Sequence, residues 1–249
     1  MRAECVSAHI EGSGPGSIPG SPSLVISGRT PVSKSYFSTG VSAFFEMATS
    51  DAQRILPPHL QPIEVRPQRS ILSVTAFHFR ESEVGPYAEL LLSVVVPPVV
   101  GSWERHPKAG FYPFLAATSG EKSRRHLANT LRIPTDPNDI DAQFIERPDQ
   151  IQVRIRSGGA PVVDVTVTQH EWHATTHLLQ SHMIDGDLRL KADVQISGSY
   201  TMHEQERGHL KLHPHEMTSA LTLDEVSAYP FREHWLKEGF ELFHPVETL

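Results

Sequence analysis

Alternation of apolar and polar residues with a period of two runs through much of the chain and restricts the folds open to it. Residues 151–156 alternate in this way, and so do residues 163–168 and 188–197. Because successive side chains of a strand point to opposite faces, each segment predicts a strand with one buried and one polar face. Residues 157–160, Ser-Gly-Gly-Ala, separate the first two segments and predict the turn of a hairpin.

Two other segments, residues 70–79 and 90–96, are apolar on both faces. This composition is typical of central strands that are covered on both sides. Strands therefore dominate the prediction, and no segment shows the regular strand–helix alternation of a parallel sheet.

Helices are predicted at three short segments. Residues 49–56 form the first and stop at a Pro-Pro pair. Residues 118–133 begin with Thr-Ser-Gly-Glu, which has the spacing of a capping box, and end before a proline. Residues 222–237 begin with Thr-Leu-Asp-Glu, which has the same spacing.

Many strands and few helices predict a mainly β (α+β) fold, in which an antiparallel sheet closes into a barrel and the helices pack outside it. A small closed barrel can enclose a cavity for a small molecule. A small-molecule ligand is therefore the expected partner.

Charge and hydropathy exclude several classes of protein. The formal net charge is −7 over 249 residues, without the basic stripe that nucleic-acid binding requires. The longest apolar run, residues 90–100, is interrupted by Ser93 and two prolines and is too short to span a bilayer. The single cysteine, Cys5, excludes an internal disulfide, and no apolar stretch typical of a secretory signal follows the N-terminus. We expect a cytoplasmic protein with neither nucleic-acid nor membrane partners.

The N-terminal residues differ in composition from the remainder. Residues 1–30 are rich in Gly, Ser and Pro and cannot bury enough apolar surface to fold alone. We expect a flexible arm that could fold over a partner subunit, and hence a homo-oligomer. Without internal repeats or a second linker, residues 31–249 are expected to form one barrel domain.

Four motifs occur in an order that resembles a known family. Residues 48–60 combine a short helix with Leu-Pro-Pro-His-Leu, and residues 85–89 read Gly-Pro-Tyr-Ala-Glu. Residues 111–114, Phe-Tyr-Pro-Phe, precede a predicted helix and then the pair Ile-Pro at residues 133–134. Over roughly residues 35–245 the chain resembles the acetoacetate decarboxylase superfamily, which implies that family's closed barrel.

The chain departs from this family at the position of its reactive lysine. There, the proline is followed by a lysine that forms a Schiff base with a β-keto acid and by a second lysine that lowers the pKa of the first; acetoacetate decarboxylase is the standard example. Here the two positions are Thr135 and Asp136. A hydroxyl cannot form an iminium ion, so we expect a member without the Schiff-base lysine. The chain has six lysines, of which Lys108 is the strongest candidate for a relocated one: Lys34, Lys108, Lys122, Lys191, Lys211 and Lys237.

Two residues are the leading candidates for acid–base chemistry. The resemblance places Glu89 in the pocket, where burial would raise its pKa; the alternative is an outward, ion-paired strand residue. His78 could point into the cavity as an acid–base partner of Glu89, or it could be a hydrogen-bonded core histidine. Thr135 and Asp136 are further catalytic candidates. The expected substrate contacts are Phe77, Tyr87, Tyr112 and Arg132, the last of which could instead be a solvated helix-end arginine.

Histidines are frequent, 15 in all, but their spacing does not predict a metal site. His170 and His173 would point to opposite faces of a strand, and His213 and His215 flank a proline. We expect neither a metal nor another cofactor.

These observations lead to three hypotheses. The first is an enzyme of specialised metabolism that acts on an enolisable keto acid or polyketide-like intermediate. It would act as a lyase or isomerase by non-covalent acid–base chemistry: isomerisation, dehydration, cyclisation or cofactor-free decarboxylation. The second is a non-catalytic barrel that binds a hydrophobic small molecule. The third is an acetoacetate decarboxylase with a relocated lysine.

Overall fold

The computed structural model describes residues 30–99, 107, 109–201 and 207–249. The predicted arm at residues 1–30 falls, except for its last residue, outside the described residues, as does Lys108. Among the described residues, no helix combines the length and the apolar character needed to cross a membrane.

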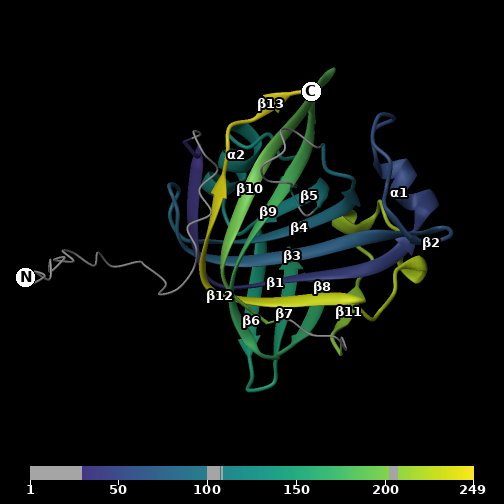
Figure 1. Ribbon diagram of the computed structural model, residues 1–249. Coiled ribbons are helices and arrows are strands. Elements are labelled where there is room, and N and C mark those ends of the chain that lie inside the picture. Colours follow the sequence, from purple (N-terminus) through teal and green to yellow (C-terminus); the bar gives the residue numbers. More distant parts are fainter. Residues whose placement is uncertain (1–29, 100–106, 108, 202–206) are drawn as a thin grey trace, which may run out of the picture.

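Seven strands close into a barrel (Figure 1). These strands are β1 (Ser33–Ala48), β3 (Arg69–Glu81), β4 (Tyr87–Val96), β5 (Gly110–Thr118), β9 (Trp172–Asp185), β10 (Leu188–Thr201) and β12 (Arg232–Phe243). Their order around the barrel is β1-β12-β10-β9-β5-β4-β3, and the pairing of β3 with β1 closes it. Neighbouring strands are antiparallel except β5 and β9, which meet in parallel near Gly110. The predicted mainly β, closed-barrel fold is confirmed.

A smaller antiparallel sheet packs against one side of the barrel. It consists of β6 (Ile140–Glu146), β7 (Gln150–Ser157), β8 (Ala160–Thr168) and β11 (His209–Leu212). Its apolar side chains, Val153 and Val165 among them, share one core with Val41, Leu72 and Leu90 of the barrel. β1, β3 and β4 are therefore covered by this sheet on one face and enclose the barrel interior on the other. This arrangement explains why residues 70–79 and 90–96 are apolar on both faces.

Two short strands complete the sheets. β2 (Glu64–Arg66) pairs with β3, and β13 (Glu247–Thr248) pairs with β10. The predicted hairpin is confirmed as β7 and β8. Its turn residues Gly158 and Gly159 have φ angles of 57° and 82°, the left-handed backbone that a two-residue hairpin turn requires and that glycine adopts without strain.

The helices match the prediction in part. α1 (Thr49–Ile55) is confirmed, and α2 (Glu121–Asn129) begins later and ends earlier than predicted. The predicted capping box does not form, because Gly120 rather than Thr118 directly precedes the helix and has no side chain to cap it. The Thr118 hydroxyl instead donates to the carbonyl of Gly120 at 3.1 Å. Among the described residues these are the two α-helices, accompanied by the 3-10 turns η1 (Glu216–Thr218) and η2 (Leu223–Glu225).

The predicted C-terminal helix at residues 222–237 is wrong. Thr222 donates from its backbone N–H and its hydroxyl to the Asp51 carboxylate, at 2.7 and 3.1 Å, so it is bonded to α1 rather than capping a helix. The segment makes only the turn η2 and then enters β12, which pairs with both β1 and β10. Pairing on two sides supplies a strand with hydrogen bonds that outweigh the local helical preference.

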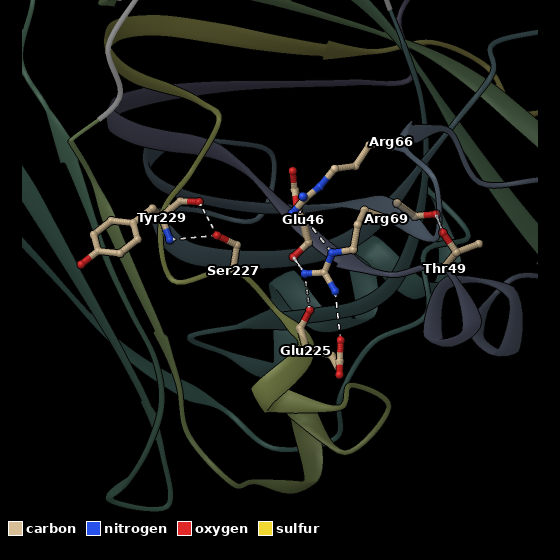
Figure 2. A network of polar contacts seen from close by, with 8 residues as sticks. Glu46, Thr49, Arg66, Arg69, Glu225, Ser227 and Tyr229 are labelled. Carbon is tan, nitrogen blue, oxygen red and sulfur yellow. Dashed lines mark hydrogen bonds and ion pairs between the residues drawn. The ribbon is translucent and has the colours of Figure 1, made fainter.

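An ion-pair network holds η2 against the barrel (Figure 2). Arg69 donates to the Glu225 carboxylate at 3.0 Å and to its backbone carbonyl at 2.7 Å, and also reaches Glu46 at 3.4 Å. Arg66 forms a second pair with Glu46, at 2.5 Å. The start of β3 and the end of β1 are thereby linked to the segment that leads into β12.

Candidate active site

A cavity of about 520 Å³ lies inside the barrel. Inward side chains of all seven barrel strands line it, together with Leu131 and Ile133 from the segment after α2. Most of the lining is apolar, and the polar groups that interrupt it include two carboxyls, two imidazoles and a guanidinium. This is the usual composition of a small-molecule site.

Glu89 is the first of the two carboxyls. It lies on β4, pairs with Phe77 of β3, and faces the cavity with only 4% of its surface exposed. Burial raises the pKa of Glu89 well above its ordinary value, and the charge of Glu241 raises it further, while a hydrogen bond from Tyr87 acts in the opposite direction. The structure thus places Glu89 in the pocket rather than on the outer surface.

Glu241 is the second carboxyl, and sequence reasoning did not find it. It lies on β12 opposite Ser35 of β1 and also lines the cavity. Removal from bulk water raises the pKa of Glu241 to about 7. A group with this pKa can accept or donate a proton near neutrality.

A bulge in β12 turns Glu241 inward. Before the bulge His234 and Leu236 line the cavity, so strict alternation would continue with Glu238. Instead, Glu238 has a φ angle of 45°, and the pairing of β12 with β10 shifts there by one residue. Lys237 pairs with Ser199 and Phe240 with Ser197, so Glu238 and Gly239 of β12 lie opposite the single residue Gly198 of β10. Such an extra residue exchanges the two faces of a strand, so Glu241 faces the cavity from there on.

Tyr87 lies next to the two carboxyls. It shares a face of β4 with Glu89, is buried, and stacks against Phe79 with ring centroids 4.8 Å apart. Its hydroxyl interacts with Ser35 and Glu89, and burial raises the pKa of Tyr87, with further contributions from Glu89 and Glu241. Tyr87 therefore stays protonated and can act as a hydrogen-bond donor toward Glu89.

Two histidines form another part of the cavity wall. The ring centroids of His177 on β9 and His234 on β12 lie 5.9 Å apart, and the ring centroids of Tyr200 and His177 lie 4.7 Å apart. His234 is oriented by a contact of 3.2 Å between its Nδ1 and the carbonyl of Thr201. Neither histidine was predicted as a site residue, because alternation does not say which face of β9 lines a cavity, and His234 lies in the segment that was predicted to be a helix.

His78, the predicted partner of Glu89, points away from the cavity. Its side chain is exposed, its Nδ1 lies 2.9 Å from the Ser38 hydroxyl, and its ring faces Phe144 of the smaller sheet at 5.8 Å. The neighbouring Phe77 is the β3 residue that lines the cavity beside Glu89. The structure therefore does not bring His78 and Glu89 together.

Thr135 and Asp136 lie beside the cavity wall rather than in it. Thr135 forms a β-bridge with Ala116, and the backbone N–H of Asp136 donates to the Ala116 carbonyl at 2.7 Å. The Asp136 carboxylate accepts from the backbone N–H of Asn138 at 2.8 Å, which stabilises a turn. Neither residue is among the described residues that line the cavity.

Three predicted substrate contacts, Tyr87, Tyr112 and Arg132, are not among the described residues that line the cavity. Arg132 has a φ angle of 58°, is exposed, and pairs with Asp185 at 3.5 Å, while its neighbours on either side line the cavity. Tyr112 packs against the core shared with the smaller sheet, whereas the adjacent Phe111 faces the cavity.

The lining formed by the described residues contains no lysine. Lys108, the candidate for a relocated Schiff base, precedes the lining residue Ala109 in sequence but is outside the part of the chain that the structure describes. Within that part, no three His, Cys, Asp or Glu side chains converge to hold a metal ion.

Comparison with known proteins identifies the fold. No protein-family profile and no curated protein matches the sequence. Among solved structures, acetoacetate decarboxylase from Legionella pneumophila aligns with a TM-score of 0.62 and 14% identity, covering 94% of this chain and 92% of that one. The enduracididine biosynthesis enzyme MppR, complexed with pyruvate, aligns with a TM-score of 0.57 and 13% identity, covering 88% and 91%. An acetoacetate decarboxylase-like enzyme from Sphingomonas wittichii aligns with a TM-score of 0.57 and 13% identity, covering 88% and 93%. The protein therefore has the acetoacetate decarboxylase fold.

Proposed function

We propose that the protein is an enzyme that acts on an enolisable keto acid or polyketide-like intermediate by general acid–base catalysis between Glu89 and Glu241, without a Schiff base. The observation that carries the proposal is the placement of two carboxyls with raised pKa values on one apolar cavity. Two carboxyls that cannot both ionise share one proton, and such a pair can supply an acid and a base at the same pH.

The proton transfers follow from this pairing. The ionised carboxylate removes a proton from the carbon next to the substrate carbonyl, and the C–H electron pair forms the new carbon–carbon double bond. The protonated carboxyl donates its proton to the carbonyl oxygen, which gives the neutral enol. If the enol is conjugated with a further double bond, return of a proton to the far carbon isomerises the substrate. If the substrate carries a β-hydroxyl, the first carboxyl protonates this group, which leaves as water, and the enol O–H returns its proton to the second carboxyl. Lyase or isomerase reactions are thus the expected outcomes.

The solved structures with this fold support a keto-acid ligand. MppR has been captured with pyruvate and with the condensation product of pyruvate and imidazole 4-carboxaldehyde. These ligands are those of MppR, and they support a keto acid as the class of ligand proposed for this cavity. A role in specialised metabolism is part of the proposal for the same reason.

Proton exchange in deuterated water tests the acid–base step without knowledge of the final product. The protein is incubated with a panel of keto acids, including pyruvate, 2-oxobutanoate and 4-oxopentanoate, and loss of the α-proton signal is followed by NMR. We expect exchange in the wild type with at least one of them and its loss in Glu89→Gln. Glu81→Gln, an exposed carboxylate near the end of β3, is the control and should exchange normally.

The outcomes separate the alternatives. Binding of keto acids without exchange would favour a non-catalytic barrel. A covalent adduct after borohydride treatment with the same acids, seen by intact-protein mass spectrometry, would favour a relocated lysine instead. Unchanged exchange in Glu89→Gln would contradict the assignment of this residue.

A further inference from the structure

The two ends of the cavity differ in chemistry. Glu89 and Glu241 lie at one end, next to Tyr87. At the other end Arg232, the first residue of β12, lines the cavity and is also exposed, so its guanidinium marks an opening to solvent. The sequence motifs did not point to Arg232, because its position at the rim depends on the pairing of β12 with β1.

Strand register gives the distance between these ends. Arg232 pairs with Phe44, and Phe44 pairs across β3 with Ser73. Ser73 in turn pairs with Ser93 of β4, so Arg232 and Ser93 belong to one row of paired residues across the barrel wall. Glu89 lies four residues before this row along β4, about 13 Å at the usual rise per strand residue, and Glu241 lies nine residues beyond it along β12, on the same side of the row.

The Arg232 side chain is available for an anion. Among the described residues it forms no ion pair or hydrogen bond, in contrast to Arg69 and Arg80, which pair with Glu225 and Glu238. The neighbouring Glu233 is buried and faces away, accepting from the backbone N–H groups of Thr168 and Arg207. An arginine without an acidic partner at the rim of a pocket suits recognition of a carboxylate, which it can bind with two parallel hydrogen bonds.

The interior between the two ends suits an alkyl chain. Leu91, Leu179, Val194, Ile196 and Leu236 line it, and aromatic side chains surround the rim. Phe44 lies there with its ring centroid 6.2 Å from Phe111 and 6.5 Å from Phe231. A volume of about 520 Å³ exceeds what a three- or four-carbon keto acid can fill, and packed interiors leave little space unfilled.

We infer that the cavity takes a medium- to long-chain keto acid in one orientation, with its carboxylate on Arg232 at the rim and its distal carbonyl between Glu89 and Glu241. The placement of the ligand carbonyl between Glu89 and Glu241 rests on the proposed function. The placement of the ligand carboxylate rests on Arg232, and the expected chain length rests on the volume and lining of the cavity. Arg232 is then a specificity-determining residue, because it fixes which carbon of the chain reaches the carboxyl pair.

Binding of simple fatty acids tests the carboxylate end independently of catalysis. Butanoate, hexanoate, octanoate and decanoate are titrated into the full-length protein by calorimetry, with methyl octanoate as the uncharged probe. We expect affinity to rise about fourfold per added CH₂, the equivalent of roughly 0.8 kcal/mol for a buried methylene. Arg232→Gln should weaken octanoate by about tenfold, as expected for loss of a charge-assisted hydrogen bond.

Controls assign the effect to the charge. Arg232→Gln should leave methyl octanoate unaffected, Arg232→Lys should retain part of the octanoate affinity, and Arg125→Gln on the exposed face of α2 should change neither. The inference would be overturned if Arg232→Gln lowered the affinities for octanoate and methyl octanoate equally, or if it did not lower the affinity for octanoate. So would affinity that does not increase from butanoate to decanoate.

Failure of the proposed function and failure of the proposed ligand orientation give different results. If no keto acid exchanges its α-proton, but octanoate still binds in an Arg232-dependent manner, the proposed catalysis fails and the orientation of a chain acid stands. If exchange depends on Glu89 but octanoate affinity does not depend on Arg232, the catalysis stands and the orientation fails.

Discussion

Glu89 on β4 and Glu241 on β12 face one cavity although β3 and β1 separate their strands in the barrel, and the charge of Glu241 raises the pKa of Glu89. Neither strand alone creates this pair. Barrel closure through β1 and β3 brings the two carboxyls to one mostly apolar cavity, where the charge of one opposes ionisation of the other.

The pair should give a bell-shaped pH profile of α-proton exchange. As pH falls below about 7, Glu241 becomes protonated and the base is lost; at higher pH the remaining proton on Glu89 is lost and with it the acid. Glu241→Gln should abolish the acidic limb together with most of the exchange. A rate that is independent of pH between 5 and 9 would contradict a shared proton.

The same pKa shift affects stability. The folded-state pKa of Glu241, about 7, lies above its ordinary value of 4.5, so the native state binds this proton more tightly than the unfolded state does. The associated stability is fully present below about pH 4.5 and is lost as pH rises through 7, by up to about 3 kcal/mol. Denaturant unfolding of Glu241→Gln should show a smaller decrease over this range than the wild type. Glu81→Gln should follow the wild type.

His182 should have the opposite pH dependence. It is 1% exposed, and neither ring nitrogen has a hydrogen-bond partner among the described residues. Burial lowers the pKa of His182 to about 4, helped by the charges of Lys191 and His59. Its contribution to the free energy of unfolding is fully present above about pH 6.5 and is lost as pH falls through 4, by a few kcal/mol.

Replacing this imidazole should remove the acid sensitivity. Unfolding of His182→Leu is expected to depend less on pH between 4 and 6.5 than that of the wild type. His173→Leu on the same strand is the control, because His173 is half-exposed with only a distant contact to Glu171 at 3.7 Å. If the two variants have identical pH dependence, the assignment of acid sensitivity to His182 is wrong.

Gly239 should not tolerate even an alanine. A Cβ at this position would lie 2.2 Å from the Phe37 ring and 2.2 Å from the carbonyl oxygen of Ser197, and backbone cannot move away cheaply. Overpacking of this kind costs about 1–3 kcal/mol or more, and we expect Gly239→Ala to lower the thermal midpoint accordingly. Gly120→Ala is the matched control: its nearest contact would be 3.9 Å away, and only about 0.5 kcal/mol is expected from the altered helix start. Equal midpoints for the two variants would contradict the close approach.

The Arg69 network should contribute to stability more than an ordinary surface ion pair (Figure 2). Arg69 is only 20% exposed and joins Glu46 to Glu225, whereas the pair of Arg80 and Glu238 is mostly exposed. Arg69→Met should lower the free energy of unfolding by about 1–2 kcal/mol, and Arg80→Met by less than about 0.5 kcal/mol. Denaturant unfolding at low and high salt measures both, and a larger loss in Arg80→Met would reverse the interpretation.

Local pattern predicted much of the fold because strands and tight turns depend on neighbouring residues. The β7–β8 hairpin, the strand at residues 188–197 and the doubly apolar strands β3 and β4 follow directly from side-chain alternation and from glycines in the turn. The helix α1 was also predictable, because two prolines end it. The C-terminal segment was not, since the capping-box spacing at Thr222 is a local signal and the pairing of β12 with two distant strands is not.

The candidate site likewise contains residues that the sequence predicted and residues that it did not. The motif around Tyr87 and Glu89 placed one carboxyl in the cavity from sequence alone, whereas alternation could not say whether Phe77 or His78 faced inward. Glu241 could not be predicted from the sequence. The bulge at Glu238 exchanges the faces of β12, and it is the register against β10 that shows it. The sequence by itself therefore determined the strands and one acid of the pair. Tertiary structure decided the second acid and the orientation of the cavity, because a shift of one residue in a strand reverses every side chain that follows.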